Sequence, residues 1–257
     1  MTANAQIEAA WNELAAFASS ADALGLSETR AIFSIGSLPG GYFRPGQSDL
    51  DVLVLFQGAP DAETNFTPAQ KAEKVRLEAL TALAEPYEME LIFLHESHLQ
   101  RDPLTGPFPY ADFAQRLLSQ SRLLWGAFDL NSLVLPGKED FACAFRRYLD
   151  YFLKNQGGEL ERFWREGQIE ELLKHTLVLM RTYLQVQRSL TEYDKTRLAQ
   201  RYRASQAPVP LPPGLARALE AQVAGEPLSS EIAAAARAEL PAFHAALVGQ
   251  ILNFNPE

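Results

Sequence analysis

Two short runs of sequence decide the fold: AIFSIGS at residues 31–37 and SDLDVLVLF at residues 48–56. Both are rich in β-branched, aromatic and other apolar residues, as buried strands are. Gly36-Ser37 marks a turn after the first strand, and two aspartates head the second. Because side chains alternate along a strand, Asp49 and Asp51 should point to the same face, while Leu50 turns toward the core.

A pair of aspartates at the start of a strand indicates a cation site. Aspartate is uncommon in strands, and two carboxylates on one face repel each other unless a cation or solvent screens them. Mg²⁺ prefers carboxylate oxygens and commonly binds together with substrate phosphates. Gly36 would let the backbone approach a phosphate, and Ser37 would offer its hydroxyl and the amides of a following helix. The alternative is a polar strand start after an ordinary Gly-Ser turn.

Gly36-Ser37, a gap of eleven residues and then Asp49-Leu50-Asp51-Val52 resemble the signature of the DNA polymerase beta-like nucleotidyltransferase superfamily. The resemblance is carried by residues 31–94. It implies that Gly36 and Ser37 hold the triphosphate of ATP or another nucleoside triphosphate. It also implies that Asp49 and Asp51 bind two Mg²⁺ ions and that a third acid from a later strand completes the site.

The third acid should come from the apolar run at residues 87–94. Glu88 and Glu90 lie on one face of this expected strand, and the apolar run follows Glu90 directly. We therefore prefer Glu90 as metal ligand or as general base for the acceptor hydroxyl. Glu88 stays open as the alternative, because a strand register inferred from sequence can slip by a step.

Helices and turns fill the rest of the first half. We expect helices at residues 5–24, 67–85 and 111–118, a short or irregular helix after Ser37, and short strands or strand-like connectors at residues 122–126 and 130–135. Pro136-Gly137 predicts a domain boundary. The chain should therefore comprise a nucleotidyltransferase domain at residues 1–135 and a C-terminal helical domain at residues 136–257.

The second half shows helical spacing of apolar residues almost throughout. Residues 177–202 are similar to the helical domain of aminoglycoside adenylyltransferases, in which a turn bears a lysine that approaches the nucleotide phosphates. The resemblance implies that role for Lys195, and an ordinary surface lysine is the alternative. It also implies an α+β fold, with a small mixed sheet flanked by helices followed by an all-α bundle.

Composition and charge restrict the partners. Residues 1–135 hold 17 acidic and 8 basic side chains, whereas residues 136–257 hold 15 of each. A nucleic-acid acceptor normally requires a basic stripe, so none is expected. The single cysteine excludes an internal disulfide. No apolar run is long enough to span a membrane, and we expect a cytoplasmic protein without a membrane partner.

These observations predict a Mg²⁺-dependent nucleotidyltransferase. It would transfer a nucleoside monophosphate, AMP from ATP in the first instance, to a hydroxyl of a small-molecule acceptor such as an aminoglycoside-like compound. Transfer to a protein or RNA acceptor is the alternative within the enzyme class. A non-catalytic interaction protein that keeps the fold is the alternative outside it.

Overall fold

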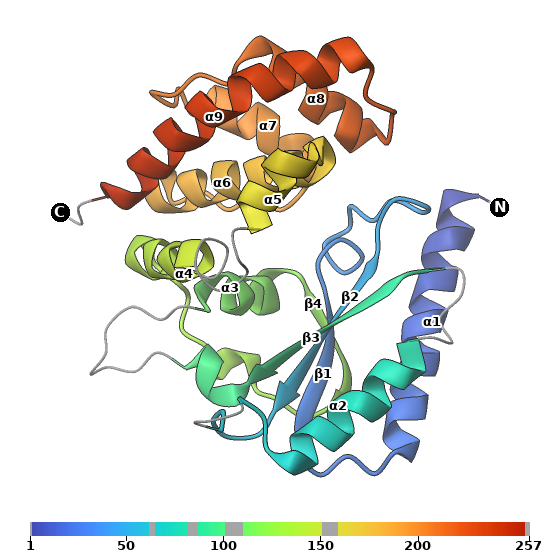
Figure 1. Cartoon of the computed structure of the whole chain (residues 1–257). Coiled ribbons are helices and arrows are strands. Elements are labelled where there is room, and N and C mark those ends of the chain that lie inside the picture. Colours follow the sequence, from blue (N-terminus) through green and yellow to red (C-terminus); the bar gives the residue numbers. More distant parts are fainter. Residues whose placement is uncertain (1, 62–64, 82–86, 101–109, 151–158, 255–257) are drawn as a thin grey trace. The chain divides into compact units, whose positions relative to one another are not determined.

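The chain divides into two compact units, residues 1–135 and 136–257. The computed structural model describes residues 2–61, 65–81, 87–100, 110–150 and 159–254 (Figure 1). Among these residues no helix is both long and apolar enough to cross a bilayer.

A four-stranded sheet forms the centre of the first unit. Its strands are β1 (Thr29–Ile35), β2 (Leu50–Phe56), β3 (Met89–His95) and β4 (Ser121–Gly126), in the order β3-β2-β1-β4. β1 is antiparallel to both β2 and β4, whereas β2 and β3 are parallel. The sheet is therefore mixed, and the predicted α+β class is confirmed.

Helices cover both faces of this sheet. α1 (Ala3–Ala23) and α2 (Pro68–Thr81) lie on one side, and α3 (Ala111–Ser119) lies on the other (Figure 1). Alternate residues of β2, including Val52 and Val54, share one core cluster with the apolar stripe of α1. Because the side chains alternate, Asp51 lies on the opposite face from this cluster.

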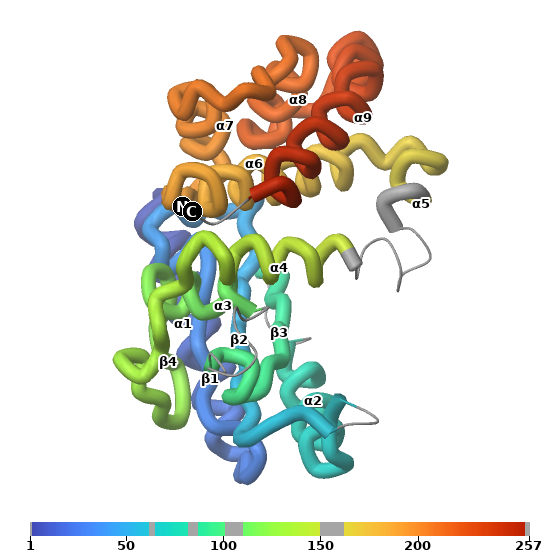
Figure 2. Tube along the Cα trace, turned by 90° about the vertical axis from the view of Figure 1, so that its left-hand side faces the viewer, coloured from blue at the N-terminus to red at the C-terminus, as the bar shows by residue number. Residues whose placement is uncertain are grey.

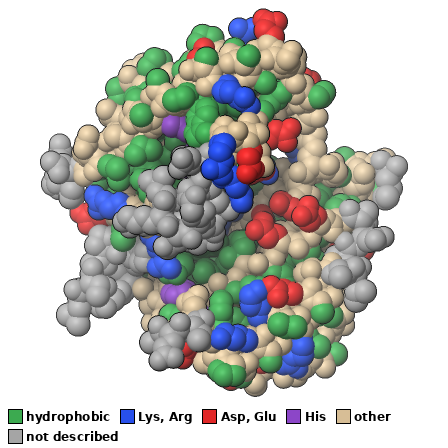
Figure 3. Space-filling model, in the orientation of Figure 1, with side chains coloured by type: hydrophobic (Ala, Val, Ile, Leu, Met, Phe, Trp, Pro, Cys, Tyr) green, Lys and Arg blue, Asp and Glu red, His purple; other side chains and the backbone are tan. Residues whose placement is uncertain are grey.

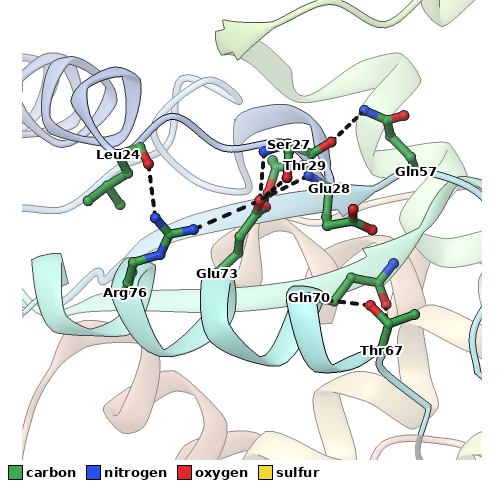
Figure 4. A network of polar contacts seen from close by, with 9 residues as sticks. All are labelled: Leu24, Ser27, Glu28, Thr29, Gln57, Thr67, Gln70, Glu73 and Arg76. Atoms are coloured by element: carbon green, nitrogen blue, oxygen red, sulfur yellow. Dashed lines mark hydrogen bonds and ion pairs between the residues drawn. The ribbon is translucent and has the colours of Figure 1, made fainter.

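A buried carboxylate joins α2 to the start of β1. Glu73 is 2% exposed and accepts hydrogen bonds from the amides of Ser27 (2.6 Å) and Glu28 (2.9 Å) and from the hydroxyl of Thr29 (2.8 Å) (Figure 4). Burial by itself raises the pKa of Glu73, but these hydrogen bonds together hold the pKa below its usual value. The network lies at the end of β1 away from Gly36.

Two expected elements differ from the structure. Residues 36–41 form hydrogen-bonded turns rather than a helix, because glycines at 36, 40 and 41 and Pro39 disfavour helix propagation. Residues 130–135 form no strand: Leu130–Ser132 is a 3₁₀ turn, in which the Asp129 side chain accepts the Asn131 amide at 3.0 Å. The predicted helix end at residues 82–85 lies outside the described residues.

The second unit consists of helices. They are α4 (Lys138–Asp150), α5 (Glu159–Glu166), α6 (Ile169–Arg188), α7 (Lys195–Ala204), α8 (Pro213–Ala224) and α9 (Ser230–Leu252). α6 is central and contacts each of the others (Figure 2). The predicted all-α second half is confirmed.

Three helices of this unit meet at a buried polar cluster. His175 Nδ1 in α6 lies 2.5 Å from the Tyr148 hydroxyl in α4, and His244 Nε2 in α9 lies 2.7 Å from Thr176 Oγ1. The two imidazole rings are 5.2 Å apart and nearly perpendicular. Burial lowers the pKa of His175 to about 4; burial and the neighbouring His175 lower that of His244 to about 3.

Candidate active site at one end of the sheet

The strand directions bring three chain segments to one end of the sheet. β1 ends at Ile35, directly before Gly36, and Ile35 pairs with Asp51 near the start of β2. β2 runs parallel to β3, and Asp51 pairs with Glu90. Residues far apart in the sequence therefore lie next to each other because β1 reverses direction relative to β2 and β3.

The three predicted carboxylates gather at this end. Asp49, Asp51 and Glu90 each place one carboxylate oxygen within 4.8 Å of the other two. Asp51 is half-buried, whereas Asp49 and Glu90 are exposed. The register pairs Glu90 with Asp51, and Glu90 rather than Glu88 completes the three-carboxylate group. Within the described parts of the chain, this is the one group of acidic, histidine or cysteine ligands compact enough to share a metal ion.

Gly36 lies against this carboxylate group. Its φ is +82°, a conformation that residues with a side chain rarely adopt. A Cβ at this position would overlap Oδ2 of Asp51. Position 36 therefore requires glycine for two reasons, its backbone angle and the space taken by Asp51.

The turn after β1 presents unused hydrogen-bond donors. The Gly40 amide donates to Gly36 O at 3.0 Å, and the Tyr42 amide donates to Ser37 O at 3.0 Å. Within the described chain, the amides of Ser37 and Leu38 have no partner, and the buried Ser37 hydroxyl also has none. Adjacent free amides in a turn form a concave anion-binding surface. The predicted donors at Ser37 therefore have no partner within the described chain, although no helix supplies them.

An open hollow of about 290 Å³ adjoins the carboxylates. Acidic side chains from three segments line it, together with apolar and hydroxyl groups. The lining residues are Asp49, Glu78, Thr81, Glu88, Met89, Glu90 and Leu91. Its acidic lining favours a cationic or neutral ligand over an anionic one.

Lys195 belongs to the second unit and is the exposed first residue of α7. Oδ1 of Asp194 caps this helix by accepting the Thr196 amide at 2.9 Å, and Oδ2 lies 3.3 Å from Nε of Arg197. Because a carboxylate already occupies the helix N-terminus, the Lys195 ammonium is the group that this turn could offer to a phosphate. Its phosphate contact stays a prediction.

Two residues at the turn, Tyr42 and Gln120, were not predicted from the sequence as parts of the site. Gln120 follows α3; its backbone oxygen accepts the Gly36 amide at 3.2 Å, and its side-chain oxygen accepts the Tyr42 hydroxyl at 2.7 Å. No spacing rule connects residue 120 to residues 36 and 42. The pairing of β4 with β1 creates this proximity.

Comparison with known proteins addresses the fold. No protein-family model and no curated protein match the sequence. A spectinomycin adenyltransferase from Enterococcus faecialis, solved with ATP and spectinomycin, aligns over 97% of this chain and 99% of its own, with a TM-score of 0.54 and 13% identity.

Two toxin–antitoxin structures align less well. One was solved with AMP-PNP (15% identity, 58% of this chain and 96% of its own) and one is a mutant of the MntA-HpeT pair (14% identity, 56% and 93%); both give a TM-score of 0.28. At that score they add nothing to the fold assignment. The whole-length likeness shows that this chain has the fold of the spectinomycin adenyltransferase, in agreement with the predicted α+β fold.

Proposed function

We propose that this protein is a Mg²⁺-dependent nucleotidyltransferase that transfers AMP from ATP, or another nucleoside monophosphate, to a hydroxyl of a small-molecule acceptor. One observation carries the proposal: the Asp49, Asp51 and Glu90 carboxylates converge beside a turn with free amides. In this proposal residues 1–135 form the nucleotidyltransferase domain and residues 136–257 the helical domain.

The acidic residues fit the metal that this chemistry requires. Three carboxylates with oxygens within 4.8 Å of one another provide the hard oxygen ligands that Mg²⁺ prefers. Asp49, Asp51 and Glu90 would hold two ions. When bound, Mg²⁺ neutralises phosphate charge and makes the α-phosphorus more electrophilic.

The turn would bind the nucleotide. The amides of Ser37 and Leu38 and the Ser37 hydroxyl would donate hydrogen bonds to phosphate oxygens, and Gly36 allows the close approach of the backbone. Lys195 would add a positive charge from the second unit.

The transfer itself is an in-line displacement. The acceptor oxygen forms a bond to the α-phosphorus while the bond from that phosphorus to the departing pyrophosphate breaks. Glu90 accepts the proton of the acceptor hydroxyl, because a second carboxylate oxygen is available beyond the one that faces the aspartates.

Three observations support a small acceptor. The hollow beside Asp49 and Glu90 is acidic and of ligand size. On the face drawn in Figure 3, the described Lys and Arg side chains are interspersed with Asp and Glu and form no basic stripe. A nucleic-acid acceptor would favour such a stripe. A solved protein of the same fold binds ATP and spectinomycin. A cationic or neutral, aminoglycoside-like molecule is the acceptor class to test first.

The first experiment measures thermal stabilisation by each nucleoside triphosphate, with and without Mg²⁺. A ligand at a hundred times its Kd should stabilise the native state by about 2.7 kcal/mol. Asp51→Asn should lose most of this effect. Asp129→Asn is the matched control, since it removes one charge from an exposed aspartate of the same unit and keeps an oxygen that can cap Asn131.

Radiolabelled α-phosphate then tests transfer to a panel of aminocyclitols and aminoglycosides, with a protein extract and tRNA as alternative acceptors. A labelled small molecule that depends on Asp51 would support the proposal. If wild-type protein shows no Mg²⁺-dependent shift with any triphosphate, the enzymatic proposal fails and a partner-binding role replaces it.

A further inference from the structure

We propose that Tyr42 and Gln120 are positioning residues that keep the Gly36–Tyr42 turn in its phosphate-binding conformation before the nucleotide arrives. This inference rests on the proposed function, since it assigns the turn to nucleotide phosphates. Neither residue needs to touch the nucleotide.

Gln120 fastens both ends of the turn. The Gly36 amide donates to its backbone oxygen (3.2 Å), and the Tyr42 hydroxyl donates to Oε1 of its side chain (2.7 Å). Gln120 is itself fixed at the end of α3, where its amide donates to Arg116 O at 2.7 Å. The turn is therefore anchored to α3 at its first and last residues.

The Tyr42 ring also packs along the turn. A Cβ at Gly40 would lie 2.5 Å from Cε1 of Tyr42 and 2.7 Å from Gly36 O. Only glycine at position 40 leaves room for both the ring and the hydrogen bond from Gly40 to Gly36. The ring and the hydroxyl of Tyr42 thus act together to hold one backbone conformation.

That conformation decides which amides are available. The Gly40, Gly41 and Tyr42 amides are used within the turn. The Ser37 and Leu38 amides and the Ser37 hydroxyl stay unpaired within the described chain. A disordered turn would have to be ordered by the nucleotide, and the apparent Kd rises as the competent fraction falls.

The Tyr42→Phe variant isolates the hydroxyl and keeps the ring. Loss of a hydrogen bond of ordinary net strength should raise the Kd for Mg-ATP about fivefold. Turnover at saturating ATP should change by less than about twofold, because the carboxylates and the acceptor side are untouched. Tyr87→Phe is the matched control: it removes a tyrosine hydroxyl that donates to Gln6 O at 2.8 Å, within the same unit but at α1.

A double-mutant cycle tests whether the two residues act through one bond. Gln120→Ala keeps the backbone bond to Gly36 but loses the contact with Tyr42. If the proposal is correct, Tyr42→Phe/Gln120→Ala should raise the Kd no more than the stronger single variant does. Independent additive effects would show that the pair does not act as a unit and would overturn the proposal.

Amide hydrogen exchange on the ligand-free protein supplies a readout that does not depend on nucleotide binding. Tyr42→Phe should speed exchange at the amides of Gly36, Gly40 and Tyr42 and leave exchange in α1 and β2 unchanged. Tyr87→Phe should leave exchange in the turn unchanged. The positioning role would be overturned if Tyr42→Phe exchanged its turn amides at the wild-type rate, or if it kept the wild-type Kd for Mg-ATP despite faster exchange. If wild-type protein binds no Mg-ATP, the proposed function fails, whereas a failure confined to Tyr42→Phe refutes this inference alone.

Discussion

Replacement of Gly36 by alanine tests the link between the Gly-Ser turn and the metal ligands. The added methyl would overlap Oδ2 of Asp51, so either the turn or the carboxylate must move. Gly36 is buried between β1 and the rest of the turn, and its amide bonds to Gln120 O, which limits the movement of the backbone. We therefore expect Asp51 to be displaced, so that the Asp49, Asp51 and Glu90 carboxylates no longer lie close enough together to share a metal ion.

Two separate losses are expected. The left-handed conformation costs alanine about 1–2 kcal/mol of folding stability. Gly58→Ala is the matched control, because Gly58 has a φ of +72° and no atom lies within 4 Å of its added Cβ. Wild-type protein and Gly58→Ala should retain a Mg-ATP shift of about 5–10 °C at a hundred times the Kd. Gly36→Ala should lose nearly all of it.

The assay is thermal unfolding of the three proteins in magnesium, in Mg-ATP and in ATP with chelator. The difference between the two alanine variants removes the common backbone strain and leaves the effect of the Asp51 contact. A Gly36→Ala protein that keeps the full Mg²⁺-dependent shift would refute the argument that Gly36 and Asp51 share one site.

Three further predictions concern other parts of the molecule. Glu73→Gln should lower the free energy of unfolding by about 2 kcal/mol at pH 7, because charge-assisted hydrogen bonds to buried donors are lost, while leaving the Mg-ATP shift intact. Since the native pKa of Glu73 lies below its usual value, this difference should shrink as the pH falls below about 4.5 in denaturant titrations; a pH-independent difference would contradict it. His175 and His244 are neutral in the native state, because their pKa values are lowered to about 4 and about 3. Their contribution to the free energy of unfolding is fully present above the unfolded pKa of about 6.5. It is lost on acidification, by up to about 2.7 kcal/mol per pH unit for the two together between pH 6 and pH 4. His244→Gln should reduce that slope; equal slopes in the variant and in the wild-type protein would show that burial of the pair is not the cause. Finally, Lys195→Ala should weaken Mg-ATP binding about tenfold, whereas Lys174→Ala, which removes an exposed lysine of the same unit paired with Glu171, should not; equal affinities, measured by calorimetry, would identify Lys195 as an ordinary surface residue.

Strands and helices with a strong pattern were predicted well. The alternation of Leu50, Val52 and Val54 with Asp51 predicted β2, and the structure has that strand at Leu50–Phe56. The helical spacing of apolar residues after Pro136 likewise predicted a helical second half, and the structure has helices α4 to α9 there. These elements are specified locally, because side-chain direction follows directly from backbone periodicity.

Predictions failed where local signals were short or competed. The helix expected after Ser37 is a set of turns, because three glycines and a proline oppose helix formation more strongly than the preceding motif favours it. Where a short strand or strand-like connector was expected at residues 130–135, residues 130–132 form a 3₁₀ turn, because the Asp129 side chain bonds to a nearby backbone amide.

By itself, the sequence determined the residue types and their order: a Gly-Ser turn, two aspartates on one strand face and a later pair of glutamates. The tertiary structure decided which of these meet. The parallel register of β2 and β3 places Glu90 opposite Asp51, and the antiparallel β1 returns Gly36 to the same end of the sheet. The pairing of β4 with β1 then brings Gln120 to Gly36 and Tyr42. Strand register and order depend on contacts between distant segments, and no local periodicity records them.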